Sequence, residues 1–252
     1  MEKFTISEYF TLPSKGLVYN NKVASEIHMS SMTTRHEMQR LAPTSTSQFK
    51  VLCDIIDDCM IDKIDMSSYD MCTGDYQFLL FKLRTATYGS DITLKTTCPH
   101  CGKVYEVKFS IDDLPVISDI ESFNKYRTFT LPKTGKEITL NYQTPHMLDR
   151  VIEAAKEYND RVGSDAVDQT LVYTIKELIN TVDGHRPDPI NVDDWIRNLP
   201  MLDTNTIFAY SAKMDESIGI DSKVEIGCNR CGKSHEVNIK PGPDFFRPEI
   251  NI

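Results

Sequence analysis

Several features that would place a chain of this size in a familiar class are missing here. No apolar run approaches the roughly 20 residues that a membrane-spanning helix needs. The first residues lack the charged, apolar and small-residue pattern of a secretion signal, so we expect the chain to stay in a reducing cytoplasm. Acidic residues outnumber basic ones by 37 to 28, and no stripe of lysine and arginine could grip a phosphate backbone. These absences argue against membrane proteins, secreted proteins and sequence-independent nucleic-acid binders.

Signals of catalysis are also sparse. The six histidines are scattered and form no ligand pair of the His-x-x-x-His kind, and no glycine-rich phosphate loop is present. Four aspartates fall on one face of an expected helix, which indicates a solvated face or a partner contact rather than an acid–base pair: Asp54, Asp57, Asp58 and Asp62. Trp195, the single tryptophan, is expected to anchor a short helix in the core. We therefore expect a protein that is not an enzyme.

What the sequence does contain is an ordinary globular composition. Its 252 residues are 40% hydrophobic and 26% charged, enough for one large domain or two modest ones with a proper core. Seven cysteines in a reducing compartment indicate metal binding or free thiols sooner than disulfides. Cys53 lies in an apolar helical pattern and is expected in the core, and no Cys/His nucleophile can be assembled from Cys53, Cys59 and Cys72.

The most informative feature is an internal repeat around two Cys-x-x-Cys motifs. Residues 92–109 and 222–239 both contain the pattern Cys-x-x-Cys-Gly-Lys-x-x-Glu-Val. Alternating apolar residues flank each motif, as a half-buried strand requires. Each copy therefore predicts a strand, a tight turn and a returning strand, with Gly102 or Gly232 supplying the positive φ needed to leave the turn. This is the pattern of a zinc knuckle.

Two knuckles offer four thiolates, the ligand count of a closed tetrahedral structural zinc site. The predicted ligands are Cys98, Cys101, Cys228 and Cys231. The 126 residues from 102 to 227 separate the two pairs, far more than a compact zinc ribbon contains. Either a helical domain is inserted between the halves of one ribbon, or each knuckle binds its own metal with outside ligands such as His100 and His235. We favour the single four-cysteine site, which would fasten the two ends of the inserted domain together.

Two other interpretations of these cysteines are weaker. Cys98-Pro-His-Cys101 matches the redox motif of a strongly oxidising thioredoxin-like oxidoreductase, but that chemistry needs the first thiolate at a helix N-terminus. The residues that follow alternate as a strand does, and the second copy has no redox resemblance. A catalytic zinc needs an open coordination position, and four thiolates leave none.

Helical patterns account for much of the remaining chain. The expected helices span about residues 34–41, 47–61, 75–89, 145–159, 165–182, 193–199 and 203–214. Their expected N-caps include Thr34 in a capping box with Glu37, Asp75, Thr144, Asp193 or Asp194, and Asp203. A turn is expected at residues 12–16, a strand at 23–29 and a hairpin at 129–140.

These elements predict an α+β fold, with a mostly helical body and two β-hairpin zinc knuckles that form a split zinc ribbon. We divide the chain into an N-terminal extended segment with helices (1–90), the first knuckle hairpin (91–115), an inserted hairpin plus helical domain (116–220), and the second knuckle with an aromatic tail (221–252). The tail, 241–248, is rich in proline, and the adjacent Phe245 and Phe246 are expected to be exposed as a contact surface.

Several segments taken in order resemble a known family. They are Leu12-Pro-Ser-Lys-Gly-Leu-Val-Tyr19, Met32-Thr-Thr-Arg-His-Glu37, Asp75-Tyr-Gln-Phe-Leu-Leu-Phe-Lys-Leu-Arg84 with Tyr88-Gly89, the first knuckle, and the second knuckle with Phe245-Phe-Arg-Pro248. This order is similar to that of the baseplate hub proteins of contractile-tailed bacteriophages of the T-even type, a group of hub subunits and hub assembly factors. The match covers most of the chain and is weakest between about 115 and 220. No catalytic residues come with it.

The resemblance implies a non-enzymatic component or assembly factor of the central hub of a phage baseplate. It implies other hub and tail proteins as partners and assembly in the host cytoplasm, and leaves open whether the protein stays in the virion baseplate. We expect residues 12–19 and the Phe245–Phe246 pair to present surfaces to those partners.

The alternative, from another class, is a nucleic-acid-binding zinc ribbon. Basic residues do lie near the knuckles: Lys95, Lys103, Lys108, Arg230, Lys233 and Lys240. The net charge of −9 and the lack of interleaved aromatic residues count against it, so no nucleic-acid partner is expected.

Overall fold

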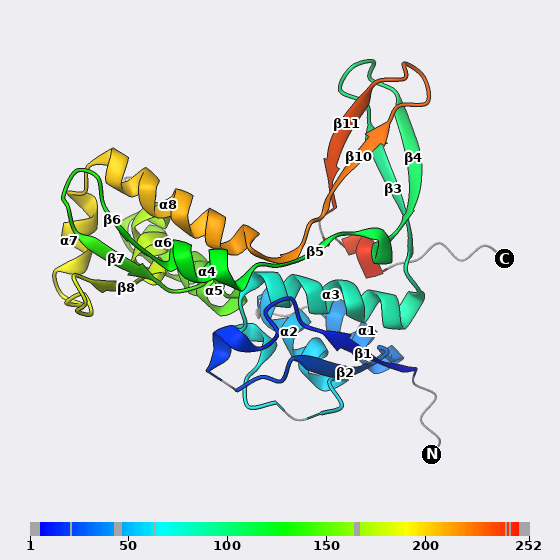
Figure 1. Ribbon diagram of the computed structural model, residues 1–252, viewed down its shortest axis with the longest axis horizontal. Helices are drawn as coiled ribbons and strands as arrows, with labels where there is room; N and C mark the ends of the chain where they lie inside the picture. Colours follow the sequence, from blue (N-terminus) through cyan, green and yellow to red (C-terminus); the bar gives the residue numbers. More distant parts are fainter. Residues whose placement is uncertain are drawn as a thin grey trace.

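The computed structural model describes residues 6–20, 22–42, 47–62, 64–163, 167–239, 241 and 243–246. Over these ranges the chain forms eight α-helices and several small antiparallel sheets, a mixture that fits the expected α+β class. Figure 1 shows three parts: a body made mainly from the N-terminal residues, a helical lobe beside it on the left, and two hairpins that project upward from the body. We call residues 6–90 the body, 119–217 the lobe, and 91–110 with 223–238 the arm.

The body packs a hairpin and three helices around a buried centre. The hairpin pairs β1 (Ser7–Thr11) with β2 (Glu26–Ser30), and the helices are α1 (Thr34–Leu41), α2 (Gln48–Cys59) and α3 (Thr73–Tyr88). Short 3-10 turns, η1 (Leu17–Tyr19) and η2 (Ser68–Asp70), connect them. The predicted α2 is confirmed, with Ser47 as its N-cap. The predicted cap of α1 is wrong by one residue, because Thr33 is the N-cap and the His36 ring accepts its backbone N–H.

Helix α3 is the central element of the body, and Asp75 does not cap it as predicted. Cys72 is the N-cap, and Asp75 is the third residue of the helix, within its first turn. Its buried carboxylate accepts hydrogen bonds from the Ser14 backbone N–H at 3.0 Å and from the Tyr19 hydroxyl at 2.6 Å. Residues 12–19 are thereby held against α3, with Leu12 and Tyr19 buried. Lys15 and Leu17 of the same segment are exposed, so its expected contact with partners stays a prediction.

The arm consists of two antiparallel hairpins that lie side by side (Figure 1). The first pairs β3 (Asp91–Thr97) with β4 (Val104–Ser110), and the second pairs β10 (Lys223–Gly227) with β11 (Ser234–Asn238). Between them the chain passes through η3 (Ile111–Asp113), β5 (Val116–Ser118), the lobe and β9 (Ile218–Ile220). Because β5 and β9 pair with each other, the chain enters and leaves the lobe at one place.

The lobe holds the remaining helices and a three-stranded sheet, β6-β7-β8. Its elements are α4 (Ile120–Arg127), β6 (Thr128–Thr130), β7 (Glu137–Leu140), α5 (Pro145–Val162), α6 (Thr170–Leu178), β8 (Ile179–Val182), α7 (Val192–Arg197) and α8 (Met201–Glu216). One hydrophobic core runs from the body into the lobe, and the buried Cys53, Cys59 and Cys72 are part of it. In the described part of the chain, no helix combines the length and apolarity that a membrane crossing requires.

Three predictions in the lobe need correction. The helix predicted for residues 165–182 gives way to strand β8, because Ile179–Val182 pairs with β7; residues 164–166 lie outside the described part. Asn191 caps α7 in place of Asp193 or Asp194. Asp203 lies inside α8, where its buried carboxylate accepts the backbone N–H groups of the β6–β7 turn at 2.8 and 2.9 Å. By contrast, Thr144 caps α5 as predicted, and the half-buried Trp195 packs on the core.

The aromatic tail is folded into the protein, which overturns its expected exposure. Residues Pro243–Phe246 form a 3-10 turn, η5, and the Phe245 and Phe246 side chains are only 5% and 3% exposed. The Phe245 ring lies 5.0 Å from that of Phe81 on α3, and the Arg84 guanidinium lies over its face. Burial against α3 removes both rings from water, so this pair completes the core of the body and leaves no aromatic contact surface.

Candidate metal centre

Each arm hairpin ends in the same tight turn. In the first, the Cys98 N–H donates to the Lys103 carbonyl and the Gly102 N–H donates to the Cys98 carbonyl, both at 2.9 Å. The second repeats these two bonds around Cys228, at 3.0 and 2.9 Å. Gly102 and Gly232 both adopt φ +69°, the left-handed conformation that the repeat predicts. The two Cys-x-x-Cys segments thus share one backbone geometry.

The two turns face each other and bring the four predicted sulfurs together. All four Sγ atoms lie within 4.8 Å of one another. Across the hairpins, Cys98 lies 3.8 Å from Cys231, and Cys101 lies 3.7 Å from Cys228. The first cysteine of each turn is buried, whereas Cys101 is half-buried and Cys231 is exposed. One cluster therefore spans both hairpins.

The sulfur geometry fits a single tetrahedral metal ion. A zinc–sulfur bond of about 2.3 Å gives a tetrahedron whose sulfurs are about 3.8 Å apart. The two cross-hairpin distances, 3.8 and 3.7 Å, match that edge. Soft thiolates of this kind suit zinc, copper(I) or iron. Of the described residues, these four cysteines form the only group of three or more metal-binding side chains close enough to share an ion.

The thiols of the cluster differ in pKa. Backbone N–H groups of Arg230 and Cys231 lower the pKa of Cys228 to about 6, with the Arg230 nitrogen 3.5 Å from its sulfur. At Cys101, the backbone N–H of Lys103 lowers the pKa, but burial and the neighbouring thiols outweigh it and raise the pKa to about 11. Several thiolates at this distance repel one another, so a bound cation is the direct way to keep all four ionised.

The histidines of the knuckles take no part in the sulfur cluster. His100 is exposed, and its Nε2 lies 3.3 Å from the Ser234 carbonyl oxygen. The His235 ring lies beside Tyr105, with ring centroids 6.2 Å apart. Neither imidazole belongs to the group of close ligand atoms, so a model with two metals finds no support in the geometry.

The redox interpretation of Cys98-Pro-His-Cys101 lacks its structural requirement. Residues 91–110, all of them described, form two strands and a turn, with β4 beginning at Val104. No helix N-terminus therefore acts on Cys98.

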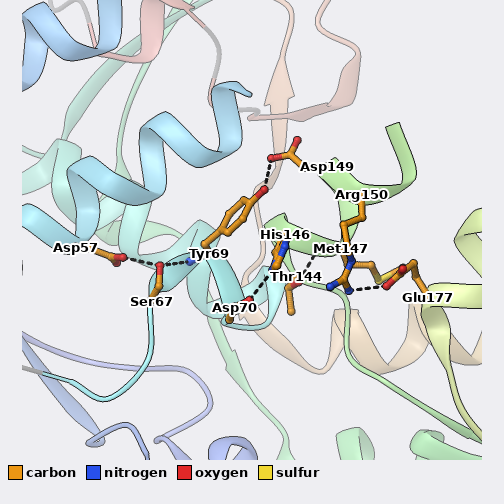
Figure 2. A network of polar contacts seen from close by, with 10 residues as sticks. All are labelled: Asp57, Ser67, Tyr69, Asp70, Thr144, His146, Met147, Asp149, Arg150 and Glu177. Atoms are coloured by element: carbon orange, nitrogen blue, oxygen red, sulfur yellow. Dashed lines mark hydrogen bonds and ion pairs between the residues drawn. The ribbon is translucent and has the colours of Figure 1, made fainter. Parts of the chain in front are cut away.

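A second polar feature joins the body to the lobe. Figure 2 shows this network, which we call the seam. It joins η2 and the residue before it to the first turns of α5, through Ser67, Tyr69, Asp70, His146 and Asp149. The buried Asp149 accepts the Ser47 hydroxyl at 2.5 Å and the Tyr69 hydroxyl at 2.8 Å. The His146 ring stacks on Tyr69, with centroids 4.6 Å apart, and its Nδ1 lies 2.9 Å from the Asp70 carboxylate.

Sequence reasoning found the cysteines but missed the seam. The cysteines can be recognised by a repeated motif. The seam joins single polar residues from segments about 80 positions apart, such as Tyr69 and Asp149. The expected acidic face of α2 is partly built into this region, since Asp57 accepts the Ser67 hydroxyl at 2.6 Å and the Ser68 N–H at 2.9 Å.

Comparison with models of known protein families gives a match over most of the chain. The model of a family described as T4 bacteriophage base plate protein matches residues 6–247, nearly the whole chain. No significant match was found in a search of curated proteins or in a search of solved structures.

Proposed function

The chain belongs to the T4 bacteriophage base plate protein family, and from this we propose that it is a non-enzymatic component or assembly factor of the baseplate hub, stabilised by a structural zinc ion. Its partners are then other hub and tail proteins. Assembly of these proteins takes place in the host cytoplasm.

The observation that carries the zinc proposal is the cluster of four sulfurs, all within 4.8 Å of one another, on two hairpins that precede and follow the lobe in the chain. Cys98, Cys101, Cys228 and Cys231 would hold the ion with all four positions filled. A zinc ion in such a site supplies rigid cross-linking, worth about 10–16 kcal/mol in small zinc-finger peptides. Here it would link the segments that enter and leave the lobe, in addition to the link made by the three-residue β5–β9 pairing.

The absence of catalysis is part of the proposal. Four thiolate ligands leave no position for a substrate or an activated water. The most buried carboxylates, Asp75 and Asp203, are occupied by hydrogen bonds that hold distant segments together. These hydrogen bonds give both carboxylates a structural role.

Elemental analysis of the purified protein tests the zinc site. We expect one zinc per chain in the parent protein and none after Cys98→Ser or Cys228→Ser, because each change removes a ligand from a different hairpin. Cys53→Ala is the matched control: it also removes one thiol, but from the core, and should retain one zinc. Two zinc ions per chain, or a full complement in either serine variant, would contradict the single four-cysteine site.

The hub role is tested in infected cells. A phage that lacks this gene is supplied with the parent protein or with Cys228→Ser, and its baseplates are examined by electron microscopy. We expect normal baseplates with the parent protein and incomplete hubs without it. Normal tails in the absence of the protein would refute an essential hub role.

A nucleic-acid-binding ribbon is the second candidate, because Lys103, Arg230 and Lys233 gather on the turns. Four thiolates with one Zn²⁺ carry a net charge of about −2, which these cations largely balance. Further along the arm, Glu106 lies opposite Lys95, and Glu225 opposite Glu236, so the basic surface does not continue; Lys240 lies outside the described residues. Strong, salt-dependent retention on a polyanion column would favour this alternative over the hub role.

A further inference from the structure

A cavity opens at the seam beside the network of Figure 2. It has a volume of about 360 Å³. Met66 and Asp70 line it from the body, and Tyr142, Met147, Arg150 and Glu177 line it from the lobe. Its walls therefore belong to both parts, and an occupant would contact both at once.

The lining favours a cation. It contains two carboxylates, Asp70 and Glu177, and one guanidinium, Arg150, so its formal charge is −1. Arg150 is already engaged, with its Nη2 2.5 Å from a Glu177 oxygen. The Asp70 carboxylate is 55% exposed, and of the described residues only His146 reaches it, through one oxygen. The second Asp70 oxygen remains free to accept a hydrogen bond.

The remaining walls suit a flat group with an aliphatic stem. Met66 and Met147 provide adaptable apolar surface, and Tyr142 provides an aromatic ring. A phenol is uncharged near neutral pH and burial raises the pKa of Tyr142 further, so the Tyr142 hydroxyl offers a neutral hydrogen-bond acceptor. A guanidinium can lie flat on such a ring while one of its N–H groups donates to the free Asp70 oxygen, whereas an ammonium group has no flat face to stack.

We propose that this cavity receives an arginine side chain presented by a protein partner. The inference rests on the proposed function in one respect, since a baseplate component is surrounded by other proteins; the chemistry of the occupant comes from the cavity itself. An anion is disfavoured by the net negative lining, and an arginine anchor in a pocket is a common energetic centre of protein interfaces. Seated there, the side chain would bridge the body and the lobe.

The test uses N-acetyl-arginine amide as the probe and the full chain with methyl-labelled methionines. We expect the NMR signals of Met66 and Met147 to shift in a saturable way as the probe is added. Asp70→Asn should weaken binding at least tenfold, because the free carboxylate oxygen is lost while the His146 contact can persist. Asp65→Asn, an exposed aspartate that does not line the cavity, is the matched control and should bind as the parent does.

Three results would overturn the proposal. The first is no methyl shift up to the solubility limit of the probe. The second is equal binding by Asp70→Asn and Asp65→Asn. The third is equal binding of N-acetyl-glutamine amide or N-acetyl-lysine amide, which lack the charged guanidinium. None of these measurements involves zinc content or hub assembly, so failure here is separable from failure of the proposed function.

Discussion

Gly74 on α3 and Gly219 on β9 bring two backbones into direct contact. A Cβ added to Gly74 would lie 2.0 Å from the Ile218 carbonyl oxygen, and one added to Gly219 would lie 3.0 Å from the Gly74 Cα. Gly219 also adopts φ +134°, which L-amino acids rarely tolerate. The strand that leaves the lobe therefore lies on the first turn of α3 with no side chain between them.

Gly74→Ala should destabilise the protein severely. The added methyl group meets backbone on β9, which cannot rotate away, so α3 and β9 must separate. We expect a loss of about 3 kcal/mol or more in the free energy of unfolding, measured by urea denaturation. Gly227→Ala is the control, because a Cβ there meets nothing within 4 Å, and it should stay within about 0.5 kcal/mol of the parent. Equal stability of the two variants would refute the backbone contact.

Phe245→Ala should also lower the free energy of unfolding, although the residue lies in a proline-rich tail. The ring is 5% exposed and packs on Phe81, so its removal leaves a cavity beside α3. We expect a cost of about 3–5 kcal/mol in the same urea assay. Ile190→Ala, at a side chain that is 86% exposed, should change stability by less than about 0.5 kcal/mol. If both variants were equally stable, the tail would be a surface feature after all.

Asp215 should make the protein less stable as the pH rises from about 4 to 7. Burial raises its pKa to about 7 from 3.8, and the neighbouring Glu216 adds to the rise. The folded state therefore holds this proton more tightly than the unfolded state, so stability falls as the pH rises through that window and is constant above it. The carboxylate accepts the Gln143 side-chain N–H at 2.6 Å, a bond that an asparagine can keep.

Asp215→Asn should accordingly flatten this part of the pH profile. Urea denaturation at intervals between pH 4 and 8 should show that the free energy of unfolding of the variant rises relative to that of the parent as the pH rises. The difference should be largest near pH 8. Asp160→Asn, at an exposed site on α5, should follow the parent curve throughout. Parallel curves for the parent and Asp215→Asn would show that this carboxyl group titrates normally.

Removing the proposed metal ion should loosen the arm before it loosens the body. Apart from the cysteines, the fully buried apolar contact between the two hairpins consists of Tyr105 and Ile226. We expect a strong chelator to speed amide hydrogen exchange in β3, β4, β10 and β11, and to leave α3 protected. Unchanged exchange in the arm after confirmed metal loss would mean that the hairpins hold each other without it.

Features set by neighbouring residues could be predicted from the sequence. The knuckle turns follow from Cys-x-x-Cys-Gly, and Thr144 before Pro145 places the start of α5 correctly. Features set by distant residues could not. Ile179–Val182 continues a helical pattern, yet it becomes a strand because β7 offers it a partner.

The misassigned aspartates show the same limit. Asp75 and Asp203 stand near helix starts and read as caps, but each carboxylate turns to backbone N–H groups of a remote segment, 61 positions away for Ser14 and 70 for Lys133. The tail was mispredicted for a similar reason. Its proline-rich sequence does not indicate that Phe245 packs against the distant Phe81. Of the candidate site, the meeting of the four cysteines was predictable and the seam cavity was not.

The separation of the two hairpins along the chain also fixes a sequence of events during synthesis. Cys231 is added 130 positions after Cys101, which at about 5–20 residues per second takes about 6–26 s. Throughout that interval the first two thiols have no second pair to meet, while the lobe emerges from the ribosome. The sulfur cluster can therefore form only after the whole lobe has been synthesised, and a chain cut short anywhere before Cys231 cannot complete it.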